Sequence, residues 1–203
     1  MKEITVWMIV QSNNSKYIDN FNTINQQVQL RYFPAIQSTE HYQIYSDFAV
    51  HKNYFCSSYM QHFEGKETRL GDNLSHMLLF NEILEKSTSD WNLVLDGSVT
   101  LQVDRFLKDY EDILRIADEH NCMFIQLHMH TKFFNMNKTH QYLDQKLYNL
   151  SIQTDNKAFF IHKKGIAQFI DKYPLRRNVN EQLGEMIPSL KSLYWKNDFF
   201  HVM

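Results

Sequence analysis

The sequence predicts an α/β fold in which helices cover both faces of a mostly parallel central sheet. Short apolar segments, such as residues 4–10, 91–95 and 158–162, alternate with segments whose apolar residues recur at helical spacing. The chain has 203 residues, 43% of them hydrophobic and 14% aromatic, which is enough for a substantial core. With only 5 Gly and 3 Pro and no Gly-rich linker, we expect one domain over residues 1–203.

The first half of the chain predicts two strands and two helices around an aromatic segment. Residues 4–10 are apolar and β-branched, which favours a buried strand, and residues 16–25 fit a short helix with Ile18 and Phe21 inward. A second strand ends at Pro34, because proline cannot donate to a sheet ladder. Residues 40–66 predict a loop with helical pieces over the sheet, and residues 70–85 predict a helix buried on more than one face.

The second half continues the alternation. We expect strands at residues 91–95, 123–127, 158–162 and 193–195, and an irregular polar segment at residues 132–155. Asp104 is the expected N-cap of a helix whose inner stripe includes Phe106 and Tyr110. Two further helices follow, one stopped by Pro174 and one over residues 179–186 that ends before Pro188.

Charge and cysteine content limit the partners and the compartment. A net charge of −2 argues against nucleic-acid binding, which requires a basic excess. Two cysteines make no disulfide framework, so we expect a reducing compartment. The N-terminal apolar run is too short for a membrane span and has no cleavage site. These observations predict a cytoplasmic protein without a transmembrane segment, which can associate peripherally with the inner face of the inner membrane.

The segment from Arg69 to Thr100 carries the candidate site. It contains the predicted helix, a polar turn and a strand that ends in Asp96, followed by Gly97 and Ser98. In α/β proteins, ligands bind outside the carboxyl ends of the strands. Asp96 is therefore the first candidate for a binding role, although an acid at this position can also be a simple turn residue.

Two motifs in this segment resemble glycosyltransferase family 25, the bacterial lipooligosaccharide galactosyl- and glucosyltransferases. The stretch Leu70-Gly71-Asp72-Asn73-Leu74-Ser75-His76 is similar to the family's Ile-Gly-Cys-Ala-Leu-Ser-His, and Leu93-Val94-Leu95-Asp96-Gly97-Ser98-Val99 takes the place of its Leu-Glu-Asp-Asp-Val. Weaker similarities occur in the family's order at residues 33–36, 158–166 and 177–181. The resemblance therefore covers most of the chain.

The resemblance implies a GT-A-like, Rossmann-like α/β/α sandwich that binds a nucleotide sugar. It implies transfer of a hexose of galactose or glucose type from a UDP-sugar to a glycolipid or oligosaccharide acceptor of lipopolysaccharide or surface-polysaccharide biosynthesis, with inversion. An Asp-x-Asp-type motif would hold Mn²⁺ or Mg²⁺ on the donor diphosphate, because hard carboxylate oxygens suit these cations. This sequence departs from the pattern at three acidic positions: Asp96 stands alone, Arg69-Leu70 replaces Glu-Ile, and Asn180 replaces an aspartate.

Candidate residues follow from the resemblance and from local spacing. The catalytic candidates are Glu181, as the base for the acceptor hydroxyl, and Asp96. The donor-binding candidates are Asp96, Ser98, His76, Arg69 and Asn180. Each has a structural alternative: a turn for Ser98, a satisfied helix histidine for His76, a solvated surface for Arg69 and an exposed first turn for Glu181.

A second metal hypothesis comes from spacing alone. In an extended segment, His128 and His130 project to one face, so they could join Asp96 in a metal site; a chain with 10 His also forms such pairs by chance. Two other functions stay open. One is a degenerate protein that binds a sugar, a nucleotide or a partner without catalysis, and the other is a metal-independent transferase that uses Arg69 or His128 for the phosphate.

Overall fold

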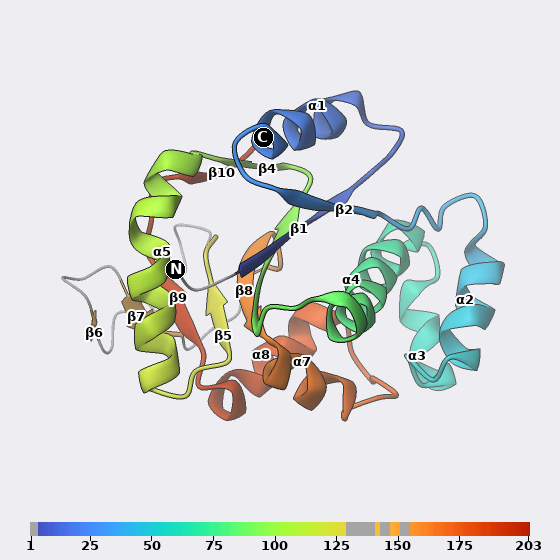
Figure 1. Cartoon of the computed structure of the whole chain (residues 1–203). Helices are drawn as coiled ribbons and strands as arrows, with labels where there is room; N and C mark the ends of the chain where they lie inside the picture. The colour runs from blue at the N-terminus through green and yellow to red at the C-terminus, as the bar shows by residue number, and fades with distance from the viewer. Residues whose placement is uncertain (1–3, 129–140, 143–146, 151–154) are drawn as a thin grey trace.

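The structure is a computed structural model that describes residues 4–128, 141–142, 147–150 and 155–203. It is an α/β/α sandwich built on one large sheet (Figure 1). The sheet order is β2-β1-β3-β8-β5-β9-β7-β6. Its strands are β1 (Ile4–Val10), β2 (Leu30–Pro34), β3 (Trp91–Asp96), β5 (Phe124–Gln126), β6 (Gln141–Tyr142), β7 (Leu147–Asn149), β8 (Ala158–His162) and β9 (Leu193–Trp195).

The sheet is largely parallel, as the sequence predicts. Strands β2, β1, β3, β5 and β9 run in one direction, because β1 is parallel to β2 and β3, and β5 is parallel to β9. Strand β8 runs in the opposite direction between β3 and β5. Leu95 of β3 therefore pairs with Ala158 at the beginning of β8, so the end of one strand meets the start of the other.

Helices cover both faces of this sheet. Helices α1 (Ser15–Asn25) and α5 (Val103–Glu119) lie on one face, together with a two-stranded sheet of β4 (Val99–Leu101) and β10 (Phe200–Val202). The other face carries α4 (Glu67–Lys86), α7 (Lys163–Ile170) and α8 (Val179–Leu190), with α2 (Tyr42–His51), α3 (Ser57–Met60) and the 3-10 helix η1 (Gln61–Phe63) beside them.

Alternation along the strands divides the apolar residues between two cores. On β1, Trp7 and Ile9 join the core under α4, whereas Met8 and Val10 join the core under α5. On β8, Phe159 and Phe160 divide in the same way. The aromatic residues of the 40–66 segment mostly pack against the first core, which agrees with their expected packing role.

The structure corrects four local predictions. Strands β6 and β7 lie within residues 132–155, which the sequence predicts to be irregular, because short strands leave little periodic pattern. Ile18 is exposed, and Asn20 and Ile24 are the buried residues of α1. Gln102 is the N-cap of α5, and Asp104 lies inside the first turn of the helix. There the negative charge of Asp104 still interacts favourably with the positive end of the helix dipole. Helix α8 continues through Pro188 to Leu190 and ends at Lys191, whose φ is 46°; a proline biases the chain against helix at the preceding residue but does not forbid it in a last turn.

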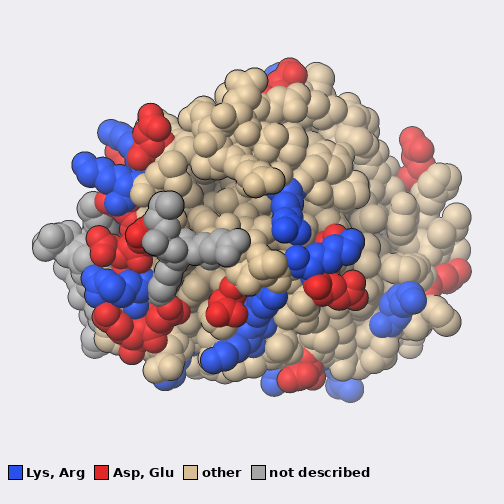
Figure 2. Space-filling model, in the orientation of Figure 1, with Lys and Arg blue, Asp and Glu red and all other residues tan. Residues whose placement is uncertain are grey.

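Surface charge is mixed rather than segregated. On the face drawn in Figure 2, acidic and basic side chains lie next to one another between large uncharged areas. Both Cys56 and Cys122 are free thiols. Within the described residues, no helix combines the length and the apolar character that crossing a membrane requires.

Candidate functional site

Asp96 lies at the carboxyl end of β3, in the position that the sequence predicts. Its Oδ1 atom accepts a hydrogen bond from the Ser98 backbone N–H at 2.9 Å and another from the Ser98 hydroxyl. The same oxygen lies 3.1 Å from Nζ of Lys157. Burial raises the pKa of Asp96, but the Lys157 charge and the hydrogen bonds from Ser98 outweigh burial and leave the pKa below its usual range.

The antiparallel β8 brings Lys157 to this acid. Lys157 immediately precedes β8, and its carbonyl accepts a hydrogen bond of 2.7 Å from the Asp96 N–H. Its own N–H donates to Asp155 Oδ1 at 3.1 Å, which fixes the turn before the strand. The Lys157 ammonium also lies 3.4 Å from the Ser98 hydroxyl oxygen. The sequence alone does not indicate Lys157, because only the pairing of β8 with β3 places it beside Asp96.

The beginning of α4 is anchored to the end of β2 by two small residues. A Cβ added at Gly71 would lie 2.3 Å from the Ile36 carbonyl oxygen, so the helix approaches the chain more closely than a side chain permits. The Ser75 hydroxyl accepts from the Ile36 N–H at 2.8 Å and donates to the Gly71 carbonyl at 2.7 Å. The Gly and Ser of the predicted motif therefore position the helix.

The polar face of α4 points towards the Asp96 region. His76 is 5% exposed, and its Nδ1 lies 2.8 Å from the Asp72 carbonyl oxygen and 3.3 Å from Nδ2 of Asn156. Its Nε2 is buried with no hydrogen-bond partner in the described part of the chain. Burial raises the pKa of Asp72, and the Asp96 charge adds to this rise, while His76 and Lys157 oppose it. Asp72 and Asn156 are further candidate site residues, which the sequence alone does not indicate.

A polar cavity of about 340 Å³ lies between the first turns of α4 and α8. It brings together three predicted residues that are far apart in sequence: Arg69, Asn180 and Glu181. The buried Oδ1 of Asn180 has no hydrogen-bond partner within the described residues. The other lining residues are Tyr59, His62, Phe63, Lys66, Asp72, Asn73, Asn156 and Asn178.

Glu181 has a structural role at this cavity. Asn178 and Glu181 form a capping box, in which the Glu181 N–H donates to Asn178 Oδ1 at 2.8 Å and the Asn178 N–H donates to Glu181 Oε2 at 3.4 Å. Asn73 joins the two helices, because its Oδ1 accepts from the Val179 N–H at 2.5 Å and its Nδ2 donates to the Arg69 carbonyl at 2.6 Å.

A second, smaller cavity of about 160 Å³ adjoins the carboxyl ends of β1 and β2 and shares the Asp72 wall with the first. Its other lining residues are Gln11, Asn13, Ile36, Gln37, Ser38, Thr39 and Thr68. The two cavities therefore lie side by side at the edge of the sheet where a ligand is expected in an α/β fold.

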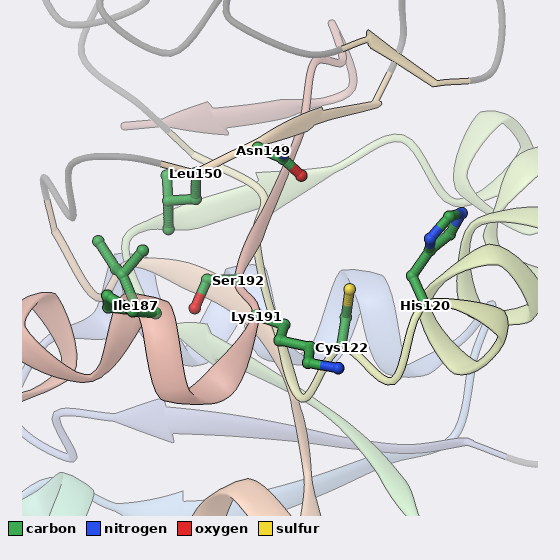
Figure 3. Close-up of a pocket in the computed structure, with 8 residues that line it drawn as sticks. His120, Cys122, Asn149, Leu150, Ile187, Lys191 and Ser192 are labelled. Carbon is green, nitrogen blue, oxygen red and sulfur yellow. The ribbon is translucent and has the colours of Figure 1, made fainter.

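A larger cavity of about 560 Å³ lies elsewhere, near the amino-terminal ends of β5 and β9 (Figure 3). Its walls include His120 and Cys122 after α5, Asn149 at the end of β7, and Lys191 and Ser192 after α8. Burial raises the pKa of the Cys122 thiol to about 11, although the Lys191 charge opposes the rise. This cavity contains none of the predicted site residues.

The second metal hypothesis is only partly within the described residues. His128 follows β5, and its Nδ1 lies 2.8 Å from Asp155 Oδ2. His130 lies outside the described residues. Within those that are described, no group of three or more His, Cys, Asp or Glu side chains could hold a metal ion.

Asp96 itself fits a divalent cation poorly. Mn²⁺ and Mg²⁺ require several bare oxygen ligands close to the ion. At Asp96, one carboxylate oxygen already accepts from Ser98 twice and contacts the Lys157 ammonium. A second cation at this oxygen would meet the repulsion of Lys157 at close range.

Comparison with solved structures shows similar folds at low sequence identity. The fold superposes over 99% of this chain on 60% of S. aureus TarS 1-349, with a TM-score of 0.53 and 13% identity. A197 from STIV gives a TM-score of 0.50 and 9% identity over 100% of this chain and 86% of that one. A glycosyltransferase involved in the glycosylation of the major capsid of PBCV-1 gives 0.48 and 9% over 95% and 82%.

The likeness to TarS 1-349 confirms the predicted α/β, GT-A-like fold class. This chain spans 60% of the TarS 1-349 chain that it resembles. No family model matches the sequence. No curated protein matches it either. Membership of glycosyltransferase family 25 therefore stays a prediction.

Proposed function

We propose that the protein is a glycosyltransferase that moves a hexose of galactose or glucose type from a UDP-sugar to a lipooligosaccharide or surface-polysaccharide acceptor. The observation that carries this proposal is the 340 Å³ cavity at the edge of a GT-A-like sheet where the parallel strands have their carboxyl ends. The first turns of both α4 and α8 line it, and helix N-termini favour anions such as a diphosphate. Lys66 and Arg69 add positive charge to the same wall.

In the proposed reaction, the sugar changes partners in a single displacement with inversion. The acceptor hydroxyl oxygen forms a bond to the anomeric carbon as the bond from that carbon to the diphosphate oxygen breaks. The bonding electron pair stays on the diphosphate, and the hydroxyl proton passes to a carboxylate base. Glu181 and Asp72 are the carboxylates on the cavity wall. A carboxyl group whose pKa is raised, such as Asp72, holds a proton more readily.

Turnover and binding with a panel of UDP-sugars test the proposal. We expect transfer or slow donor hydrolysis with UDP-glucose or UDP-galactose, and calorimetric binding of UDP. Arg69→Gln should raise KM by about tenfold, because an arginine contact with phosphate contributes about 1.4 kcal/mol or more. Arg115→Gln, on the exposed face of α5, is the matched control and should leave KM unchanged. Absence of both turnover and UDP binding contradicts the proposal.

One observation favours a second function, in which the protein binds a sugar or nucleotide without catalysis. Both carboxylates that the resemblance would use in catalysis are engaged in the folded structure, Asp96 with Lys157 and Ser98, and Glu181 in the capping box of α8. UDP-sugar binding by calorimetry, with no product in an extended incubation, would select this function over the first.

A further inference from the structure

We propose that Lys157, rather than a divalent metal ion, supplies the positive charge next to Asp96 that holds the donor diphosphate. This inference rests on the proposed function and specifies how the donor is bound. In the predicted motif, an acid at the end of this strand would hold a metal ion, and the ion would neutralise the phosphates. In this chain the acid instead contacts an ammonium group, 3.1 Å away.

The geometry makes Lys157 a fixed donor rather than a mobile surface lysine. Its carbonyl accepts from the Asp96 N–H at 2.7 Å, so its backbone is joined directly to the end of β3. Its ammonium contacts Asp96 and the Ser98 hydroxyl, at 3.1 Å and 3.4 Å. An ammonium carries three donors, and these two contacts are those that the described residues make, which leaves one donor for a ligand oxygen. The side chain is 38% exposed, so it is accessible from solvent.

Asp96 acts here as a positioning residue. Its Oδ1 atom accepts from the Ser98 N–H at 2.9 Å and lies 3.1 Å from the Lys157 ammonium, so the fixed carboxylate holds the ammonium in place. The Asp96–Lys157 pair alone is close to neutral, whereas one carboxylate with Mn²⁺ would carry a net positive charge. The remaining positive charge must therefore come from the cavity wall, where Lys66 and Arg69 lie.

The nearby groups make a competing metal site unfavourable. Burial and the charge of Asp96 both raise the pKa of the Asp72 carboxyl group, while the charges of His76 and Lys157 oppose this rise. The Lys157 charge acts on both acids. A divalent ion would have to displace the ammonium from Asp96 before it could bind. The described residues contain no group of three or more His, Cys, Asp or Glu side chains that could hold such an ion.

Calorimetry of UDP binding in excess EDTA and in saturating Mn²⁺ tests this inference. The wild-type dissociation constant should change less than about twofold between the two buffers. Lys157→Gln should weaken UDP binding about tenfold or more, because hydrogen bonds to charged groups contribute about 1.5–3 kcal/mol. Lys157→Arg keeps the charge and should retain affinity within a few-fold. Lys164→Gln removes an exposed lysine at the start of α7 and is the control that should bind as wild type does.

A second measurement needs no nucleotide. Titration of the wild-type protein with Mn²⁺ alone, followed by electron paramagnetic resonance of the free ion, should show no site that Asp96→Asn removes. A stoichiometric Mn²⁺ site lost in Asp96→Asn, UDP binding that requires Mn²⁺, or full affinity in Lys157→Gln would each overturn the inference alone. Absence of UDP binding in both buffers, together with absence of turnover, would instead contradict the proposed function. Circular dichroism of every variant verifies folding.

Discussion

At the scale of single residues, Glu181 has two roles that one substitution can separate. Glutamine keeps the side-chain oxygen that accepts from the Asn178 N–H, but it cannot take a proton from an acceptor. Glu181→Gln should therefore change the free energy of unfolding by less than about 0.5 kcal/mol and lower kcat about 100-fold or more, the usual contribution of a general base. Urea denaturation and turnover assays measure both quantities. Wild-type kcat in this variant would leave Glu181 with only its capping role.

The Asp96–Lys157 pair predicts a dependence of stability on pH. Because the folded-state pKa of Asp96 is depressed, its contribution is present above the unfolded pKa of about 4 and is lost as pH falls through the folded value. Lys157→Met should cost about 1 kcal/mol of unfolding free energy at pH 7, and this cost should shrink as the pH falls below about 4. Lys164→Met should show no such trend. If Lys157→Met lowered the free energy of unfolding equally at pH 7 and below about pH 4, that result would contradict the pairing of Asp96 with Lys157.

Gly97 explains why the acidic motif cannot simply be restored by adding a second aspartate. A Cβ at this position would lie 3.0 Å from the Ile9 carbonyl oxygen and 3.1 Å from Cδ2 of Tyr17. The Gly97 N–H donates to the same carbonyl at 2.8 Å, so the two segments cannot easily separate. Gly97→Asp should cost about 1–3 kcal/mol of stability and should add no Mn²⁺-dependent activity.

Thermal unfolding with and without Mn²⁺ measures both effects of Gly97→Asp. Ser12→Asp, in the exposed turn after β1, adds the same charge without the close contact and should leave the melting temperature unchanged. A stable Gly97→Asp protein with Mn²⁺-dependent turnover would contradict this prediction and would show that the fold can still accept a metal motif.

At the scale of elements, the approach of α4 to the end of β2 controls the shape of the smaller cavity. Gly71→Ala places a methyl group against the Ile36 carbonyl oxygen, which lies too close to Gly71 to leave room for that group. The helix must move or the turn must shift, which should cost about 2–3 kcal/mol and weaken UDP binding. Glu85→Ala, on an exposed turn of the same helix, is the control for helix propensity. Wild-type stability in Gly71→Ala, from urea denaturation, would contradict this packing.

Elements with a strong local pattern could be predicted from the sequence. The strands β1, β3, β8 and β9 and the helix α4 follow from apolar runs and helical spacing, and each lies within a few residues of its predicted place. The pairing partners could not be predicted, because a local pattern does not encode which strands become neighbours or in which direction they run. This is why the sequence identified Asp96 but not Lys157, which reaches it through the antiparallel β8.

In the candidate site too, the local motif could be predicted from the sequence, whereas the roles of its residues could not. The motif from Leu70 to His76 predicted a functional helix start, and the structure places that helix at the cavity. It also shows that Gly71, Asn73 and Ser75 serve packing and helix connection, roles that a motif alone does not separate from ligand binding. Ile18 was predicted inward because a short helix offers too few turns to determine which face is buried.

At the scale of the whole molecule, two apolar cores share one sheet. Trp7 belongs to the core under α4, and Trp91 and Trp195 belong to the core under α5. Trp7 of β1 also donates from Nε1 to Asn92 Oδ1 of β3 at 3.1 Å, which joins adjacent strands across the sheet. Neighbouring residues of every central strand contribute to opposite cores, so neither core can lose its packing while the strands remain intact.

This arrangement predicts that both cores unfold in one cooperative transition. A variant with Trp91→Phe and Trp195→Phe reports only on the core under α4, and Trp7→Phe reports only on the other. Within each variant, the urea midpoint from tryptophan fluorescence should coincide with the midpoint from far-ultraviolet circular dichroism, because loss of either core removes the strands that hold the other. Separate midpoints in either variant would show that the two layers unfold independently and that the sheet does not couple them.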